Sequence, residues 1–227
     1  AFYGYLGREA CRNQEYSGEA SSPQRRDPDC FKEISGKNSF TFLLEEGGAR
    51  VKNHIVIIGF NGSGKKRVGK RLAKDLSLPY LDVDKEIVRK MKMSVNEIYT
   101  RFGEPFYRAL ETTLIKELIE LDQRCVISVG AGLPLQEQNH KYLRELGTVV
   151  YLKASVETLA KRLEDSSSFR GGENVPEKIR KLLAVRGPVY EKMADLEVVT
   201  GVKSFDDLID EIEKKLENCE KTVEKSQ

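Results

Sequence analysis

The sequence predicts an α/β fold in which helices cover both faces of a parallel sheet. Two observations support this prediction: short β-branched runs alternate with helical stretches through most of the chain, and a glycine-rich turn joins the first run to the first helix. The first run, residues 54–58, lacks alternating polar positions, which is typical of a strand buried on both faces. After the turn, Val68, Leu72 and Leu76 recur every four residues and predict one face of a helix.

Five strands are expected to form the sheet. They lie at residues 54–58, 79–84, 125–129, 147–152 and 196–200. Ser94, followed three residues later by Glu97, has the pattern of a capping box that starts a helix. Further helices are expected at 110–121, at 155–163, from 176 onward and at 208–216. Gly187 and Pro188 predict the end of the helix that starts near residue 176.

Composition divides the chain into three parts. Residues 1–51 hold Gly, Ser, Pro and mixed charges without a sustained period, so we expect an N-terminal extension that is mostly linker-like or disordered. Within it, only residues 40–44 are expected to be ordered. Residues 52–218 form the predicted α/β domain, and residues 219–227 form a charged C-terminal tail.

The composition argues against several classes of partner. Basic and acidic residues number 38 and 36, so the net charge is +2 and predicts neither a nucleic acid nor a membrane as partner. No run approaches the ~18 apolar residues of a membrane span. The four cysteines form no CxxC pair, and we expect reduced thiols in a cytoplasmic protein rather than a zinc site or disulfides. No unexplained apolar stripe stands out, so a monomer is expected.

A phosphate-binding motif follows the first predicted strand and opens a helix. Residues 59–65 match the G-x4-G-K pattern of a P-loop in the context that the motif requires, which predicts a P-loop NTPase-like three-layer sandwich. Glycines let the backbone turn its N–H groups toward an anion, and the helix N-terminus adds partial positive charge. Lys65 is a candidate catalytic residue that reaches the β- and γ-phosphates. The residues expected to bind ATP are Asn61, Gly62, Ser63, Gly64, Lys65, Lys66 and Arg67.

One position departs from this motif. The residue after Lys65 should be Ser or Thr, whose hydroxyl helps to hold Mg²⁺, but the sequence has Lys66 there. A cation does not ligate another cation. Two placements are open: Lys66 turns to solvent and leaves the metal ion to water and the nucleotide, or its ammonium takes the position of the metal ion.

The segments that follow resemble the shikimate kinase family. In order along the chain they read GEPFYRALE (103–111), SVGAGLPL (128–135), GTVVYLKAS (147–155) and KIRKLLAVRGPVYEKMADLEV (178–198). The first fits the family's GE-x-x-F-R-x-x-E pattern with Tyr107 for Phe, and the second resembles its triple-glycine segment. With the P-loop, these pieces span about residues 52–212. The resemblance implies an ATP-dependent kinase for the 3-hydroxyl of shikimate, with Mg²⁺ as cofactor.

The resemblance also implies roles on the acceptor side. Asp84 would bind the acceptor hydroxyl and act as base or orienter, and Asp82 would hold water around Mg²⁺. Alternate residues of a strand point the same way, so both carboxylates are expected to face one cleft. Arg108 and Arg186 match the arginines that bind the substrate carboxylate, a role that suits the planar guanidinium.

Two further features belong to the acceptor side. Glu111 lies three residues after Arg108 on the same helix face, so we expect it to hold the guanidinium. The resemblance places Gly130, Ala131 and Gly132 where the backbone approaches the acceptor closely. Because an alanine disfavours positive φ, Ala131 either has a negative φ or narrows the site.

The residues predicted for the lid and for the adenine end of the site follow from the resemblance alone. Residues 165–174 occupy the position of the family's lid and are a few residues shorter. Arg170 is the candidate for the catalytic lid arginine that closes over the transferred phosphate. Arg162 matches a position that flanks adenine, although a solvated surface charge explains it equally well.

Two alternatives to a shikimate kinase stay open at this point. Lys66, Ala131 and the altered lid all fall on the catalytic machinery, which favours a kinase-like binding or regulatory module. The retained Asp84, Arg108 and Arg186 argue for an enzyme. A P-loop kinase for another small hydroxy acid is the third possibility, because paired arginines favour a carboxylate without naming it.

Overall fold

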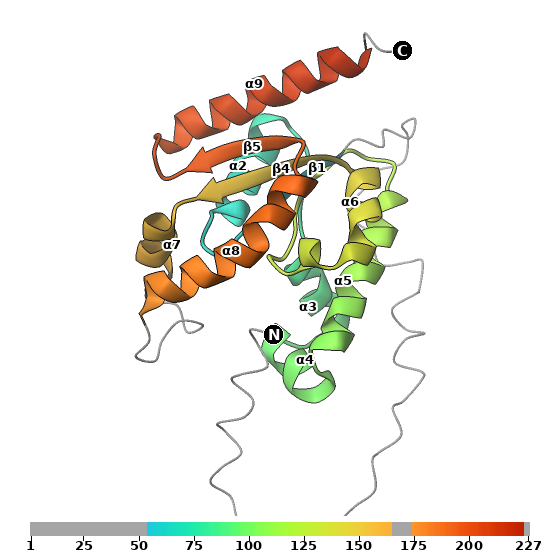
Figure 1. Cartoon of the computed structure of the whole chain (residues 1–227). Coiled ribbons are helices and arrows are strands. Elements are labelled where there is room, and N and C mark those ends of the chain that lie inside the picture. The colour runs from blue at the N-terminus through green and yellow to red at the C-terminus, as the bar shows by residue number, and fades with distance from the viewer. Residues whose placement is uncertain (1–53, 165–173, 225–227) are drawn as a thin grey trace, which may run out of the picture.

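The computed structural model describes residues 54–164 and 174–224 (Figure 1). Within these ranges one sheet has the strand order β2-β3-β1-β4-β5, and every pairing is parallel. The strands are β1 (His54–Gly59), β2 (Tyr80–Asp82), β3 (Val126–Ser128), β4 (Gly147–Ala154) and β5 (Leu196–Thr200). The predicted five-stranded parallel sheet is confirmed, and the strand before the P-loop lies at its centre.

Helices connect the strands. In the described residues they are α2 (Lys65–Asp75), α3 (Val83–Met91), α4 (Val95–Phe102), α5 (Glu104–Ile119), α6 (His140–Leu146), α7 (Val156–Leu163), α8 (Val175–Met193) and α9 (Phe205–Glu224). Two short 3-10 turns, Leu133–Leu135 and Glu137–Asn139, precede α6. The predicted capping box starts α4: Ser94 Oγ accepts from the Glu97 N–H at 3.3 Å, and Glu97 accepts from the Ser94 N–H at 2.7 Å. The sequence patterns above do not predict α3 and α6.

β1 is buried on both faces because its side chains alternate between two hydrophobic clusters. Ile55 and Ile57 pack in the cluster that includes α2 and α9. Val56 and Ile58 pack in the cluster that includes α5, α6 and α8. Each such buried side chain contributes about 1.5–3 kcal/mol of transfer free energy. Helices therefore cover both faces of the sheet, which confirms the three-layer sandwich (Figure 1).

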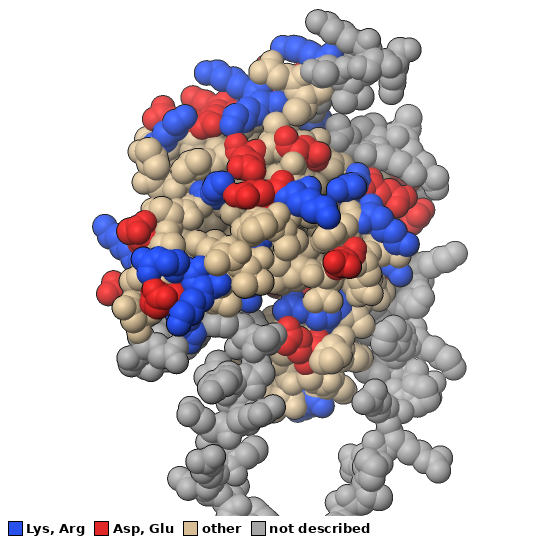
Figure 2. Space-filling model, in the orientation of Figure 1, with Lys and Arg blue, Asp and Glu red and all other residues tan. Residues whose placement is uncertain are grey.

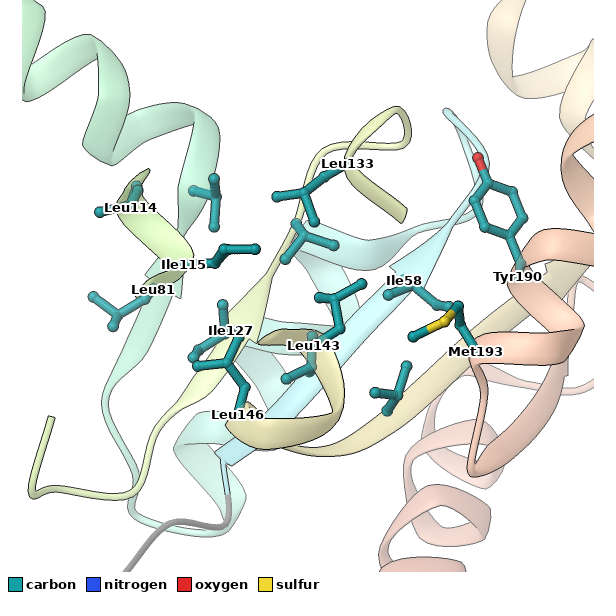
Figure 3. Close-up of a cluster of buried hydrophobic side chains, with 14 of the residues drawn as sticks. Ile58, Leu81, Leu114, Ile115, Ile127, Leu133, Leu143, Leu146, Tyr190 and Met193 are labelled. Atoms are coloured by element: carbon teal, nitrogen blue, oxygen red, sulfur yellow. The ribbon is translucent and has the colours of Figure 1, made fainter. Parts of the chain in front are cut away.

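The cluster on the α5, α6 and α8 side supports the loop that follows β3. Figure 3 shows Leu143 and Leu146 of α6 packed close to Ile127 of β3. At the other end, the side chain of Tyr190 extends from α8 with its hydroxyl outermost. That hydroxyl donates to the carbonyl of Ala131 at 2.7 Å, which ties the loop to the core.

The second strand is shorter than predicted, so Asp82 and Asp84 do not both lie on it. β2 ends at Asp82, and Asp84 lies in the first turn of α3 instead of on the strand. The reason is local capping: Asp82 Oδ1 accepts a hydrogen bond from the Lys85 N–H at 3.3 Å, which starts the helix. Strand alternation therefore does not explain why the two carboxylates share a cleft.

The end predicted for the last long helix before β5 is also wrong. α8 continues through Gly187 and Pro188 to Met193. An interior proline costs about 3 kcal/mol because it removes one helix hydrogen bond. Tyr190 and Met193 lie beyond the proline in the same helix and are both buried, and each contributes about 1.5–3 kcal/mol, which offsets that cost. Arg186 consequently projects from the body of a helix and not from its end.

The remaining predictions on chain organisation have mixed outcomes. α9 runs to Glu224, so most of the segment expected as a C-terminal tail is helical. The extension at 1–51, with its stretch at 40–44, and the lid loop with Arg170 lie outside the described residues. In the visible face of Figure 2, basic and acidic side chains are interspersed. Among the described helices, none combines the length and apolarity needed to cross a membrane.

Candidate active site

The P-loop has the backbone shape that an anion-binding turn needs. Gly62 and Gly64 have φ values of 81° and 100°, in the left-handed region that favours glycine. A Cβ at Gly59 would lie 2.8 Å from the carbonyl oxygen of Leu152, so close packing against β4 requires glycine there too. The Oγ of Ser63 is buried and has no hydrogen-bond partner among the described residues. The loop therefore offers backbone N–H groups and one unpaired hydroxyl to a phosphate.

Lys65 begins α2 and points back into the P-loop. Its Nζ donates to the carbonyl oxygens of Gly59 at 2.9 Å and Phe60 at 3.0 Å. Burial lowers the pKa of Lys65 to about 8, and the nearby carboxylates of Asp84 and Asp82 oppose part of this effect. At neutral pH the ammonium is therefore still protonated, and it lies where phosphates are expected.

Lys66 turns toward the two carboxylates that follow β2. Its Nζ lies 3.0 Å from Asp82 Oδ2 and 3.7 Å from Asp84 Oδ2. The other oxygen of Asp84 accepts a hydrogen bond from the Tyr107 hydroxyl at 2.9 Å. Of the two placements open from the sequence, the structure has the ammonium at the carboxylates. Tertiary contacts thus bring Asp82 and Asp84 to one cation, although they belong to different elements.

A pocket of about 270 Å³ has P-loop residue Asn61 in its wall. Every residue predicted to bind the acceptor lines this pocket: Asp84, Arg108, Gly130, Ala131, Gly132 and Arg186. They come from α3, α5, the loop after β3 and α8, so the carboxyl edge of the sheet assembles them. This is where ligands bind in open α/β sheets, because β1 is the strand at which the chain order reverses.

Arg108 is held by two carboxylates. Its Nε and Nη2 donate to Glu104 Oε1 at 3.3 and 2.9 Å, and its Nη1 donates to Glu111 Oε2 at 2.7 Å. The predicted contact with Glu111 is confirmed, and the contact with Glu104 is an addition. A guanidinium has five N–H groups, so these bonds leave donors for a ligand carboxylate. Gly132 makes room for the guanidinium: a Cβ there would lie 2.4–2.6 Å from its atoms.

Glu111 is the most deeply buried carboxylate of the site, with a side chain only 1% exposed. Burial raises its pKa to about 7; the neighbouring Asp84 and Glu104 add to this effect and Arg108 opposes it. Glu111 Oε1 would lie 2.8 Å from a Cβ on Gly130, and Asp84 Oδ1 would lie 3.0 Å from it. Gly130 is therefore required because two carboxylates approach its backbone.

Arg186 comes from α8 and also lines the pocket. Its guanidinium carbon is 5.6 Å from the centroid of the Phe60 ring, within the range of a cation–π contact. Ala131 is absent from the non-glycine residues of the described chain that have positive φ, so its methyl group is tolerated. Its carbonyl accepts from Tyr190, whose hydroxyl pKa burial raises to about 12. The alanine therefore fits the loop without backbone strain.

Arg162, predicted to flank adenine, is anchored to the P-loop. Its Nη1 lies 3.0 Å from the carbonyl oxygen of Gly62, 3.4 Å from that of Ser63 and 3.3 Å from Thr200 Oγ1. These contacts join α7 and β5 to the phosphate loop. Arg162 is thus more than a solvated surface charge, and its contact with adenine stays a prediction.

Arg67, another residue predicted to bind the nucleotide, does not line the pocket and contacts α9 instead. Its guanidinium carbon lies 4.0 Å from the centroid of the Phe205 ring, at the start of α9. This cation–π contact connects α2 to α9 on the side of the sheet away from α5. The nucleotide contact of Arg67 stays a prediction.

Several pocket residues were not predicted from the sequence. They are Val95, Asn96, Tyr99, Glu104, Tyr107, Leu135 and Gln136. Glu104 and Tyr107 lie inside residues 103–111, and Leu135 lies inside residues 128–135, so the segments that resemble the family could have pointed to them. The other four carry no local signal, because they reach the pocket only through the tertiary fold.

Comparisons with known proteins agree with this geometry. The family model described as shikimate kinase matches residues 61–217. The shikimate kinase of Dictyoglomus turgidum is 34% identical over 169 residues, which cover 73% of this chain and 98% of that protein. The shikimate kinase of Cereibacter sphaeroides is 39% identical over 155 residues, covering 67% and 77%.

A solved structure of the same kind is also similar. The structure titled "Shikimate kinase from Acinetobacter baumannii in complex with shikimate" has a TM-score of 0.68 and 31% identity, and the match covers 74% of this chain and 95% of that one. The family match extends over most of the described domain, and the site residues line one pocket. This chain belongs to the shikimate kinase family.

Proposed function

We propose that this chain transfers the γ-phosphate of ATP to the 3-hydroxyl of shikimate. The observation that carries the proposal is the single pocket that joins Asp84, Arg108 and Arg186 to the P-loop residue Asn61. Such a pocket places an acceptor hydroxyl next to bound phosphates. In phosphoryl transfer, positioning and electrostatic stabilisation supply most of the catalysis.

On the nucleotide side, the chain supplies positive charge and N–H donors. The P-loop amides and the Lys65 ammonium bind the phosphates, and Arg162 holds the loop from behind through the Gly62 carbonyl. Arg170 in the lid is the proposed residue that balances charge on the transferring phosphate. Arg67 and Lys66 complete the proposed nucleotide side.

On the acceptor side, Asp84 orients the hydroxyl and takes its proton. The hydrogen bond from Tyr107 at 2.9 Å holds this carboxylate toward the pocket. Arg108 and Arg186 bind the substrate carboxylate from α5 and α8, and Glu104 with Glu111 fixes the Arg108 plane. The loop at 130–132 lets the substrate lie close to the backbone.

The residues present do not fit a Mg²⁺ ion held by the protein at Asp82. One oxygen of Asp82 caps α3, and the other faces the Lys66 ammonium at 3.0 Å. Across residues 54–164 and 174–224, no three His, Cys, Asp or Glu side chains gather as metal ligands. When Mg²⁺ is bound in such kinases it neutralises phosphate charge; here we propose that it arrives on the nucleotide, with water as its other ligand.

The test is ADP release, coupled to NADH oxidation, with ATP and shikimate supplied. We expect shikimate-dependent turnover that falls about 100-fold or more in Asp84→Asn, the order lost with a general base. Asp206→Asn, on the exposed surface of α9, is the matched control and should keep full activity.

Two other outcomes would redirect the assignment. Binding of ATP and shikimate without turnover would favour a regulatory or binding module over an enzyme. If shikimate neither reacts nor binds while ATP does, the acceptor is another small hydroxy acid. Calorimetric titration of shikimate against neutral polyols then shows whether the paired arginines select a carboxylate.

A further inference from the structure

Lys66 provides a positive charge at a position where the site has two carboxylates. It lies one residue after Lys65 in the first turn of α2, and its side chain is 54% exposed. Its Nζ contacts Asp82 Oδ2 at 3.0 Å and Asp84 Oδ2 at 3.7 Å. One ammonium thus bridges the end of β2 and the start of α3.

Asp82 has little capacity left for another cation. Its side chain is 3% exposed, and Oδ1 accepts from the Lys85 N–H. Oδ2 is buried and accepts no hydrogen bond from the described residues, so the ammonium of Lys66 supplies the charge that balances it. A buried carboxylate oxygen needs such a partner, because an unpaired buried charge is strongly unfavourable.

Both oxygens of Asp84 are partnered as well. Oδ1 accepts from the Tyr107 hydroxyl, and Oδ2 faces Lys66. Lys65 is close enough to both carboxylates for them to stabilise its charge. The local set of Lys65, Lys66, Asp82 and Asp84 is therefore neutral, with two charges of each sign. A divalent ion added there would leave a net positive charge, whereas a hydroxyl side chain at position 66 would leave a net negative one.

We propose that Lys66 is a tethered cation that replaces a protein-held divalent metal ion in this site. Its ammonium neutralises Asp82 and Asp84 and faces the nucleotide phosphates, so nucleotide binding depends weakly on Mg²⁺. This inference rests on the proposed nucleotide site, and it concerns how that site balances phosphate charge. It predicts that Lys66 and a divalent ion compete for the same two carboxylates.

The experiment measures ADP binding by calorimetry, in EDTA and in excess Mg²⁺, for the native chain and three variants. Lys66→Ser supplies a hydroxyl, Lys66→Met removes the charge at similar length, and Lys70→Ser changes an exposed lysine one turn further along α2. For the native chain and Lys70→Ser, the Kd values in EDTA and in Mg²⁺ should agree within about threefold, because removing the metal ion should cost less binding free energy than one charge-assisted hydrogen bond. For Lys66→Ser, Mg²⁺ should tighten ADP binding about tenfold or more, because the metal ion would then supply at least one charge-assisted contact. Lys66→Met should bind ADP more weakly than the native chain in EDTA.

A second measurement follows the metal ion itself. Electron paramagnetic resonance of Mn²⁺, titrated into protein with ADP, reports how tightly the complex holds a divalent ion. Lys66→Ser should hold Mn²⁺ more tightly than the native chain, and Lys70→Ser should match the native chain. Circular dichroism of each variant shows whether the fold is kept, so a change in binding can be assigned to the site.

The outcomes separate the two proposals. If the native chain shows the same strong dependence on Mg²⁺ as Lys66→Ser, while shikimate turnover proceeds, the tethered-cation inference is wrong and the kinase assignment stands. If ADP binds to none of the proteins with or without Mg²⁺, both the inference and the proposed function are overturned.

Discussion

Gly132 shows how one missing side chain positions a functional group. A Cβ at this position would lie 2.4 Å from Arg108 Nη2 and 2.5 Å from Nη1. Because these atoms are the far end of a flexible side chain, Gly132→Ala should displace the guanidinium without unfolding the protein. We expect the KM for shikimate to rise about tenfold or more, the order expected when one charged hydrogen bond is lost, with the KM for ATP unchanged.

Gly187→Ala is the matched control for this prediction. Gly187 also belongs to the segment around the site, but a Cβ there meets no atom within 4 Å. It lies inside α8, where alanine is a better helix former than glycine by roughly 0.5–1 kcal/mol. This variant should keep both KM values and should be slightly more stable to urea. An unchanged KM for shikimate in Gly132→Ala would show that Arg108 does not hold the substrate.

The lowered pKa of Lys65 predicts that ADP binding is coupled to proton uptake. Burial lowers its pKa to about 8, and bound phosphates favour the charged form and therefore raise the pKa. ADP binding at pH 8 should take up about half a proton, and binding at pH 6.5 much less, because Lys65 is then already charged. Calorimetry in HEPES and in Tris, which have different heats of ionisation, measures the uptake. Lys65→Arg keeps its charge at both pH values and should take up none there.

At the scale of elements, His54 joins β1 to α5 and β3. Its Nδ1 accepts from the Cys125 N–H at 3.1 Å, so its Nε2 carries the proton that is donated to the Leu118 carbonyl at 3.1 Å. The bond from Cys125 needs the neutral ring, because a protonated Nδ1 cannot accept, and burial lowers the pKa of His54 below 6.5. The folded-state pKa is thus below the unfolded value, so this contribution to stability is present above about pH 6.5 and is lost as the pH falls.

Urea unfolding between pH 7.5 and pH 5 tests this linkage. The free energy of unfolding of the native chain should fall with pH by up to about 1.4 kcal/mol per unit more than that of His54→Gln, which has no titrating ring. His140→Gln is the control, because His140 lies on α6 with one hydrogen bond, to Pro134. Parallel curves for the native chain and His54→Gln would contradict the prediction.

At the scale of the whole molecule, the sheet holds the two halves of the site in register. β1 carries the P-loop, and its neighbours β3 and β4 lie on either side, so the acceptor loop after β3 and helix α7 after β4 flank the same phosphate loop. The two hydrophobic clusters support this edge from opposite faces. Site residues on α5 and α8 are therefore positioned by packing rather than by their neighbours in sequence.

The family match begins at residue 61 and therefore does not include the N-terminal extension, residues 1–51. A chain of residues 52–227 should keep the kcat and the KM values of the full chain within about twofold. Its melting temperature should stay within a few degrees, which corresponds to a change in the free energy of unfolding below ~1 kcal/mol. A coupled assay and thermal unfolding of both chains measure this. A large loss of stability would show that residues 1–51 pack on the domain.

Local pattern alone determined the types of most elements and the position of the phosphate loop. Hydrophobic periodicity reports burial within a strand or helix, so the five strands and the α4 capping box follow from nearest neighbours along the chain. The P-loop is likewise a local structure, because its glycines and Lys65 act within seven residues. The Arg108–Glu111 pair could be predicted for the same reason, since residues three apart share a helix face.

The tertiary structure alone decided which charges meet. Three contacts join residues from different elements: Lys66 with Asp82, Tyr107 with Asp84, and Gly132 with Arg108. Hydrophobic periodicity carries no information on such contacts. Packing also overrode local signals: Asp84 lies on a helix because Asp82 caps it, and α8 passes Pro188 because Tyr190 and Met193 are buried beyond it. Sequence thus determined most of the elements, and long-range packing determined how their side chains form the site.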